Sequence, residues 1–132
     1  MRPKQRGFTM AELLIVIVIV AILTSMSVVR YINLRDKSRV AAATYDLDLV
    51  RKLLAYYATD YSRYPGAATT YNELQSQLID PTGQIYGKCP ISHTFDWFSY
   101  SLDSDSNYVM RVRVQDRNQT ILVATPDRIY PE

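Results

Sequence analysis

One apolar segment constrains this chain of 132 residues more than any other feature. Residues 8–29 form a run of 22 positions with a single charged side chain, Glu12. A helix of that length rises about 1.5 Å per residue and reaches across the ~30 Å hydrocarbon core of a membrane. Three basic side chains precede the run, as in segments that stay on the cytoplasmic side. We predict a basic leader over residues 1–7 and a membrane-spanning helix over residues 8–29.

Glu12 is unusual in this position, because a carboxylate at mid-depth in hydrocarbon costs about 2 to 3 kcal/mol unless it is protonated or paired. The apolar run contains no basic side chain that would pair with it. One interpretation is an interfacial carboxylate that reaches the headgroups, and the other is a group that meets its cation elsewhere. A secretory signal with a small-x-small site at Ser25 and Ser27 is the rival for the whole run. The length of the run and the position of Glu12 disfavour that rival.

The residues from Gly7 to Val16, GFTMAELLIV, resemble the leader junction of type IV pilins and type II secretion pseudopilins. The resemblance implies that a prepilin peptidase cuts between Gly7 and Phe8. It also implies that the new N-terminus of Phe8 is methylated and that Glu12 is the glutamate that the family carries shortly after the cut.

Cleavage before Phe8 would create an ammonium group that methylation leaves charged, and this group is a suitable partner for Glu12. Pairing between Glu12 of one subunit and the Phe8 amine of a neighbour would favour assembly and fix the axial register. Removing one member of such a buried pair costs about 3 to 5 kcal/mol. Phe8 and Glu12 also have the i, i+4 spacing of a pair within one helix, so pairing inside the chain stays open.

Residues 30–64 are predicted to continue the helix as an amphipathic segment. Apolar side chains recur there at alternating steps of three and four, at Val40, Ala43, Leu47, Val50, Leu54, Tyr57 and Tyr61. No proline or glycine interrupts the chain from Phe8 to Tyr64, whereas many pilins have a proline where this sequence has Val29. The stripe also suits a coiled-coil dimer, but a helix continuous with a membrane span favours packing on the chain's own head.

The remaining chain predicts a small head. Residues 65–94 form a loop with a short second helix, whose start is marked by the capping pattern of Thr70 and Glu73. Residues 95–132 alternate between apolar and polar and predict a three-stranded antiparallel meander with a C-terminal tail. The expected fold is α+β and pilin-like, with a long N-terminal helix packed on a small antiparallel three-stranded sheet.

Asp103, Asp105 and Asn107 have the alternating oxygen spacing with which a calcium loop begins, and the resemblance to major pseudopilins implies a C-terminal calcium site. However, the glycine and the final acid of an EF-hand loop fall on Tyr108 and Val114. We therefore expect a hairpin turn and no cofactor, and retain calcium as the alternative. Cys89 and His93 are too few to form a zinc site.

Other functional classes have little support in the sequence. The 125 residues after the leader carry 12 basic and 13 acidic side chains, so binding of nucleic acid is not expected, even with Arg111, Arg113 and Arg117 close together. A solvated strand is the simpler interpretation of those arginines. Eleven tyrosines are interpreted as packing residues. No phosphate loop or nucleophile-base set is present, so an enzyme is not expected.

The sequence thus predicts a structural filament subunit. As the resemblance implies, it is held in the inner membrane as a single-pass precursor and then assembled into a periplasmic or extracellular filament. The implied partners are further copies of the chain, the prepilin peptidase, an inner-membrane platform protein, an assembly ATPase and membrane lipid. The lack of a cysteine pair favours a pseudopilin over a pilin with a disulfide-closed loop. The alternative is an uncleaved, single-pass binding domain that does not polymerise.

Overall fold

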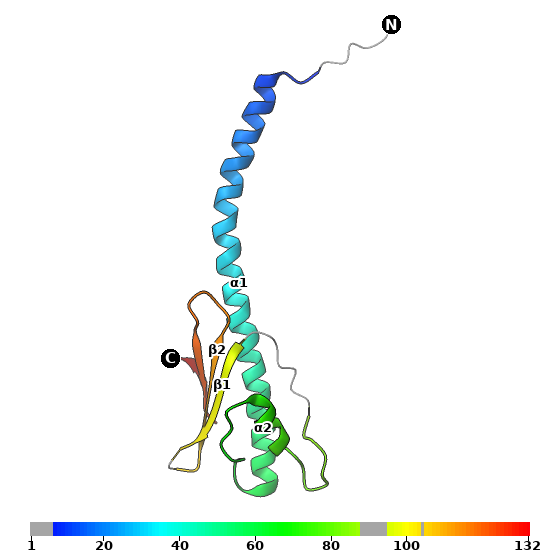
Figure 1. Cartoon of the computed structure of the whole chain (residues 1–132), viewed down its shortest axis with the longest axis vertical. Helices are drawn as coiled ribbons and strands as arrows, with labels where there is room; N and C mark the ends of the chain where they lie inside the picture. The colour runs from blue at the N-terminus through cyan, green and yellow to red at the C-terminus, as the bar shows by residue number, and fades with distance from the viewer. Residues whose placement is uncertain (1–6, 88–94, 104) are drawn as a thin grey trace. The chain divides into compact units, whose positions relative to one another are not determined.

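The structure is a computed structural model that describes residues 7–87, 95–103 and 105–132. Its elements are, in chain order, α1 (Met10–Tyr61), α2 (Tyr71–Gln77), β1 (Phe95–Leu102), β2 (Tyr108–Val114), β3 (Ile121–Ala124) and β4 (Ile129–Pro131). Figure 1 shows this order along the chain. The chain divides into an N-terminal unit, Met1–Arg35, and a C-terminal unit, Asp36–Glu132. Both units contain part of α1.

The described part of the N-terminal unit is almost entirely helical, as predicted. Helix α1 begins at Met10, two residues after the predicted start, and contains neither proline nor glycine. Its most apolar 18-residue window has a mean hydropathy of 2.7, and none of that window is buried. A soluble helix would bury such a surface, so α1 has the length and composition of a membrane-spanning helix.

The core lies in the C-terminal unit and uses the predicted stripe of α1. Most stripe positions are buried: Ala43, Leu47, Val50, Leu54 and Tyr57. Val40 is half-buried, and Tyr61 is exposed because the helix ends there. The facing side of the sheet supplies Tyr100, Tyr108, Met110, Val112 and Val114 to the same cluster. The heptad stripe therefore packs on the chain's own sheet.

The sheet has four antiparallel strands in the order β1-β2-β3-β4, so the prediction of three strands was wrong. Strand β4 pairs with β3 through Tyr130 opposite Val123. Three residues that end in a proline are too few to show the alternation by which a strand is recognised. The three predicted strands are present, and β2 alternates between buried and half-buried residues along its whole length, as expected.

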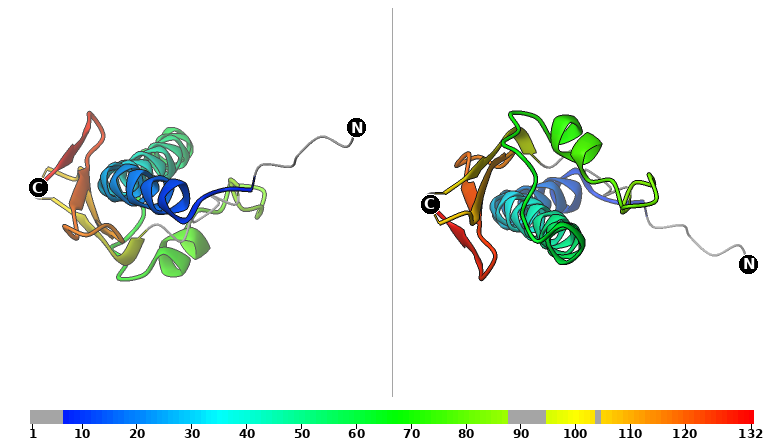
Figure 2. Two further views of the ribbon diagram at one scale, coloured as in Figure 1. Left: turned by 90° about the horizontal axis from the view of Figure 1, so that it is seen from above. Right: turned by 90° about the horizontal axis from the view of Figure 1, so that it is seen from below.

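Two arginines of α1 join the helix to the turns of the sheet. Arg39 donates a hydrogen bond to the carbonyl of Gln115, and Arg51 donates to the carbonyl of Pro126 at 2.6 Å. Figure 2 shows the sheet on one side of the C-terminal part of α1, with α2 beside the same stretch of helix. The ring of Tyr71 in α2 meets that of Phe98 in β1 edge to face at 5.8 Å.

Helix α2 begins as the sequence predicts, with one difference. Thr70 is its N-cap residue, and the Thr70 hydroxyl accepts from the backbone N–H of Glu73 at 3.3 Å. In an ideal capping box the Glu73 carboxylate would bond to the N-cap residue, whereas here its strongest bonds are to the residue before it. The carboxylate accepts from the backbone N–H of Thr69 at 2.9 Å and from the Thr69 hydroxyl at 3.2 Å. The start of α2 is therefore capped over two successive threonines.

Candidate processing and assembly site

The predicted cleavage position lies at the open end of α1. Gly7 and Phe8 precede the helix, and both are exposed, Phe8 by 79%. No described residue lies within 4 Å of the place that a Cβ on Gly7 would occupy. The described residues therefore do not block access to the Gly7–Phe8 peptide bond, and a peptidase site requires such access.

Glu12 is held by a residue that sequence reasoning did not consider. One oxygen of its carboxylate accepts from the backbone N–H of Thr9 and from the Thr9 hydroxyl, both at 2.9 Å. In return the backbone N–H of Glu12 donates to the Thr9 hydroxyl at 3.3 Å. These reciprocal bonds are a capping box, which satisfies N–H groups that a helix start leaves without partners.

The capping box gives Glu12 a third interpretation beside the two made from sequence. The pattern Thr-x-x-Glu that carries it is the one that identified Thr70 and Glu73, so the same signal would have found it. In this chain the Phe8 nitrogen is still in a peptide bond with Gly7 and carries no charge. Pairing of Glu12 with a Phe8 ammonium, within the chain or between chains, stays a prediction.

The predicted calcium residues lie in the turn between β1 and β2. The turn closes through Asp103 N–H to Asn107 O at 2.7 Å and Ser106 N–H to Asp103 O at 3.0 Å. Asp103 and Asn107 line a hollow of about 250 Å³ together with Asp127 from the turn before β4, but Asp105 is not in its lining. Two carboxylates and an amide fall short of the six to eight oxygens that calcium takes, so the described residues fit the ion only in part.

Two of the three arginines weighed for nucleic acid are engaged with acids on the outer face of the sheet. Arg113 contacts Asp96 at 2.8 Å, and Arg111 lies 3.9 Å from Glu132. A β-bulge between Phe95 and Trp97 turns Asp96 outward to meet Arg113. These pairs offset the positive charge that a polyanion would need, and they support the interpretation as a solvated strand.

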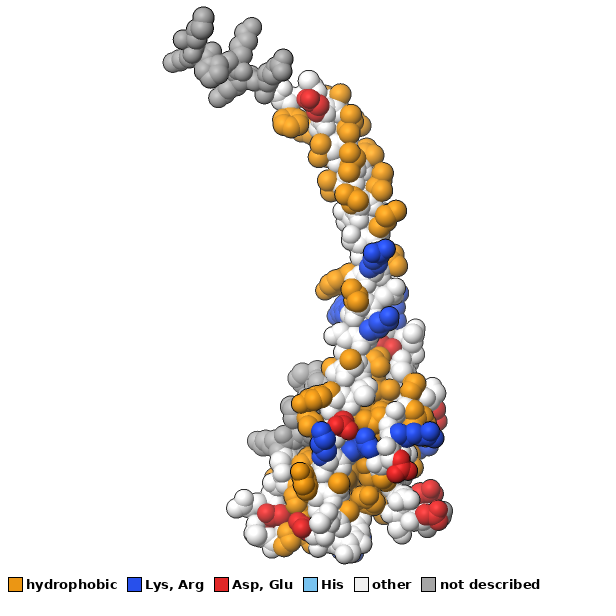
Figure 3. All heavy atoms as spheres, turned by 180° about the vertical axis from the view of Figure 1, so that it is seen from behind, with side chains coloured by type: hydrophobic (Ala, Val, Ile, Leu, Met, Phe, Trp, Pro, Cys, Tyr) orange, Lys and Arg blue, Asp and Glu red, His pale blue; other side chains and the backbone are white. Residues whose placement is uncertain are grey.

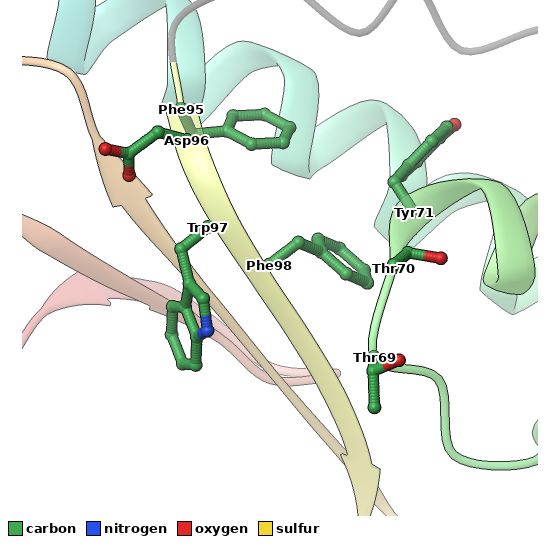
Figure 4. A pocket seen from close by; sticks show the side chains of 7 residues that line it. All are labelled: Thr69, Thr70, Tyr71, Phe95, Asp96, Trp97 and Phe98. Atoms are coloured by element: carbon green, nitrogen blue, oxygen red, sulfur yellow. The ribbon is translucent and has the colours of Figure 1, made fainter.

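A hollow of about 370 Å³ lies between the start of β1 and the start of α2. Figure 4 shows the rings of Phe95 and Phe98 pointing toward α2, while Asp96 and Trp97 point to the other side of the strand. The hydroxyls of Thr69 and Thr70 in its lining are bonded within the cap of α2. Four of the seven lining residues are aromatic, so the hollow offers mainly apolar contact.

The tyrosines pack against one another at the end of α1 and on the sheet. Tyr57 stacks on Tyr61 with ring centroids 4.5 Å apart, and Tyr64 meets Tyr108 edge to face at 4.8 Å. Burial raises the pKa of the Tyr108 phenol to about 12, so this phenol stays protonated at neutral pH. Their interpretation as packing residues agrees with this geometry. Cys89 and His93 lie outside the described residues.

Comparison with known proteins locates the decisive similarity at this same end of the chain. Residues 2–28 match the family model described as the prokaryotic N-terminal methylation motif. The N-terminal segment of the chain is therefore similar to this methylation motif. This confirms the resemblance drawn from the residues around Gly7, Phe8 and Glu12, which all lie inside the methylation motif.

Similarity beyond the methylation motif is to type II secretion system core protein G. The chain is 37% identical over 81 residues to that of Klebsiella michiganensis, which covers 61% of this chain and 55% of the relative. It is 35% identical over 79 residues to that of Escherichia coli K12, covering 60% and 52%. The chain thus spans about half the length of the curated relatives it matches. No solved structure gave a significant match.

Proposed function

We propose that this chain is a structural subunit of a secretion pseudopilus, since the relatives are core proteins of a type II secretion system. The precursor is held in the inner membrane by residues 8–29, with the C-terminal unit on the far side of the membrane from the leader. A prepilin peptidase removes residues 1–7 and the Phe8 amine is methylated. The platform protein and the assembly ATPase then add the subunit to a filament of further copies.

The observation that carries the proposal is a helix whose apolar segment is wholly exposed and begins at a processing motif. Phe8 and the large apolar side chains from Leu13 to Val29 are exposed, and the C-terminal unit has a complete core of its own. A surface of this size is stable only in lipid or against other apolar helices. A membrane-stored subunit that polymerises through its N-terminal helix meets both conditions in turn.

Glu12 has a defined task in this scheme. Before cleavage its carboxylate is held in the capping box with Thr9, so the precursor tolerates it at the edge of the membrane. After cleavage the Phe8 ammonium of a neighbouring subunit offers a charged partner, and formation of that pair favours the docked register. The proposed role is structural, and the two reactions in the scheme, cleavage after Gly7 and methylation of Phe8, are carried out on the chain by enzymes.

Mass spectrometry of the intact chain and its N-terminal peptide, from native membranes and from the sheared surface fraction, tests the proposal. A chain that begins at methylated Phe8 is the expected result. A chain that begins at Met1 would instead identify a static membrane anchor for a binding domain. A chain that begins after Ser27 would identify a secreted domain whose first helix served as a signal.

A further inference from the structure

A basic segment follows the apolar run directly. Val29 is the last residue of the run, and Arg30, Tyr31 and Arg35 come next within the N-terminal unit. Both arginines are exposed, and Tyr31 is 68% exposed. Figure 3 shows Lys and Arg side chains gathered on α1 just beyond its apolar stretch. The apolar run is therefore followed by two positive charges and by the amphipathic side chain of Tyr31.

These two arginines differ from three of the arginines in the C-terminal unit. Arg51, Arg111 and Arg113 each lie within 4 Å of an acidic side chain. Among the residues that the structure describes, no ion pair involves Arg30 or Arg35. Their guanidinium groups are consequently available to an external anion.

Helix geometry directs both side chains back toward the apolar run. Each Cα–Cβ bond of an α-helix tilts toward the N-terminus, and long side chains follow that direction. Arg30 lies about 1.5 Å and Arg35 about 9 Å beyond Val29 along the helix. The headgroup layer is about 5 to 8 Å thick on each side of the hydrocarbon. Both guanidinium groups therefore reach that layer when the run spans a membrane.

The two arginines also cover different sides of the helix. Five residues correspond to about 140° of rotation at 3.6 residues per turn. Arg30 and Arg35 therefore meet different lipids, while Tyr31, four residues before Arg35, lies near it on the helix surface. A tyrosine has an apolar ring and a polar hydroxyl, and it is typical of the interface between membrane and water.

We propose that Arg30 and Arg35, with Tyr31 between them, form an arginine collar whose guanidinium groups bind the phosphates of anionic phospholipids in the leaflet next to the C-terminal unit. The guanidinium groups donate paired hydrogen bonds to phosphate oxygens, and a negative lipid adds long-range attraction. Each cation near such a surface contributes about a fivefold preference. The inference rests on the membrane-stored stage of the proposed function and adds the class of lipid that the subunit prefers.

The test uses the full chain in vesicles of phosphatidylcholine and phosphatidylglycerol. Trp97→Phe removes the native tryptophan, and Tyr31→Trp places a fluorophore inside the collar. One of the two lipids carries a nitroxide near the top of its acyl chain, and fluorescence quenching by each labelled lipid is compared at equal mole fraction. Labelled phosphatidylglycerol is expected to quench several-fold more effectively, with the difference reduced by added salt.

Two double variants separate the collar from net charge. Arg30→Ala with Arg35→Ala is expected to remove the lipid preference, because both guanidinium groups are lost. Arg63→Ala with Arg117→Ala changes the net charge equally at two exposed arginines of the C-terminal unit and is expected to preserve it. Equal quenching by the two lipids in the parent chain, or a preference that survives the first pair of substitutions, would overturn the inference.

Two further outcomes would contradict the collar for separate reasons. Loss of the preference on adding inorganic phosphate, but not chloride at matched ionic strength, would show a site for free phosphate and would overturn the assignment to lipid. Absence of quenching by either labelled lipid would show that the run does not enter the membrane. That last result contradicts the proposed function itself, and so differs from failure of the collar alone.

Discussion

In the proposed scheme, Glu12 serves two states of the protein. Its carboxylate accepts two hydrogen bonds from Thr9, so its charge is partly compensated while the leader is present. The proposed pairing would give the same carboxylate a charged partner after cleavage, the Phe8 ammonium of a neighbouring subunit. Contacts made only in the filament would not explain why the precursor tolerates this carboxylate at the edge of the membrane, whereas the bonds to Thr9 do.

Replacing Glu12 by alanine is expected to leave cleavage after Gly7 intact and to reduce filament yield about a hundredfold or more, because one member of a buried ion pair is lost. The sheared fraction and the N-terminal peptide measure the two effects separately. Glu73→Ala is the matched control, since Glu73 makes the same type of cap on α2. Filaments at the parent level from the Glu12 variant would contradict the pairing.

Acid is expected to destabilise the C-terminal unit through two carboxylates that accept local hydrogen bonds, Glu73 at the start of α2 and Asp80 in the turn after it. Bonds from Thr69 hold the pKa of Glu73 below its usual value, and bonds from Thr82 and Gln84 do the same for Asp80. A lowered folded pKa means that the unfolded chain binds more protons, so stability is full above about pH 4.5 and falls as the pH drops further. Melting temperature against pH measures this loss, and Asp80→Asn should flatten the curve.

At the scale of elements, period and turn chemistry predicted most of the C-terminal unit. The apolar stripe from Ala43 to Tyr57 repeats over several helical turns, and the alternation in β2 repeats along the whole strand. Each repeated position adds to the evidence for the predicted element. Strand β4 has no such repetition and exists through its pairing with β3. The bulge at Asp96 likewise has no repeated pattern that would reveal it, and the carboxylate meets Arg113 on the neighbouring strand.

The candidate site was predictable to a different extent. Gly7, Phe8 and Glu12 were identified from a resemblance, which carries information about enzymes that act on the chain. The hydrogen bonds between Thr9 and Glu12 followed from local helix chemistry and were missed, although the pattern was legible. The hollow that joins Asp103 to Asp127 depends on how two turns meet, and no local pattern specifies that.

The interlocked faces of α1 and the sheet make the core sensitive to lost volume. Leu54 is fully buried among the residues that join the helix to the sheet. Leu54→Ala is expected to lower the free energy of unfolding by about 2 to 5 kcal/mol, because it removes buried methyl groups and leaves a cavity. Urea unfolding of the full chain in mild detergent, followed by Trp97 fluorescence, measures the change.

Tyr56→Ala on the exposed side of the same helix provides the comparison for Leu54. This side chain is 63% exposed, so its loss is expected to change stability by less than about 0.5 kcal/mol. A Leu54 variant no less stable than the Tyr56 variant would show that the stripe of α1 does not support the sheet.

At the scale of the whole molecule, the two units differ in where they place their apolar side chains. The C-terminal unit contains the hydrophobic core and the sheet, whereas the described part of the N-terminal unit offers its apolar residues outward. The hydrophobic core of the C-terminal unit contains no residue of the apolar run.

Addition of calcium tests whether the C-terminal unit is stabilised by a metal ion. We expect added calcium to leave the melting temperature unchanged, because the turn at Asp103 is closed by its own backbone bonds and the hollow offers few oxygen ligands. Thermal unfolding with calcium and with a chelator measures this. A rise with calcium that Asp127→Asn abolishes would establish the metal site that the family resemblance implies.

The two outer strands of the sheet bear on how densely such heads can be crowded. Tyr100 on β1 exchanges both backbone hydrogen bonds with Ala68, and β4 is three residues long and ends at Pro131. Neither strand offers a long row of free backbone groups to a neighbour. Both features limit pairing between the sheets of C-terminal units at high local concentration, and so disfavour amyloid-like aggregation wherever copies of the chain are packed densely.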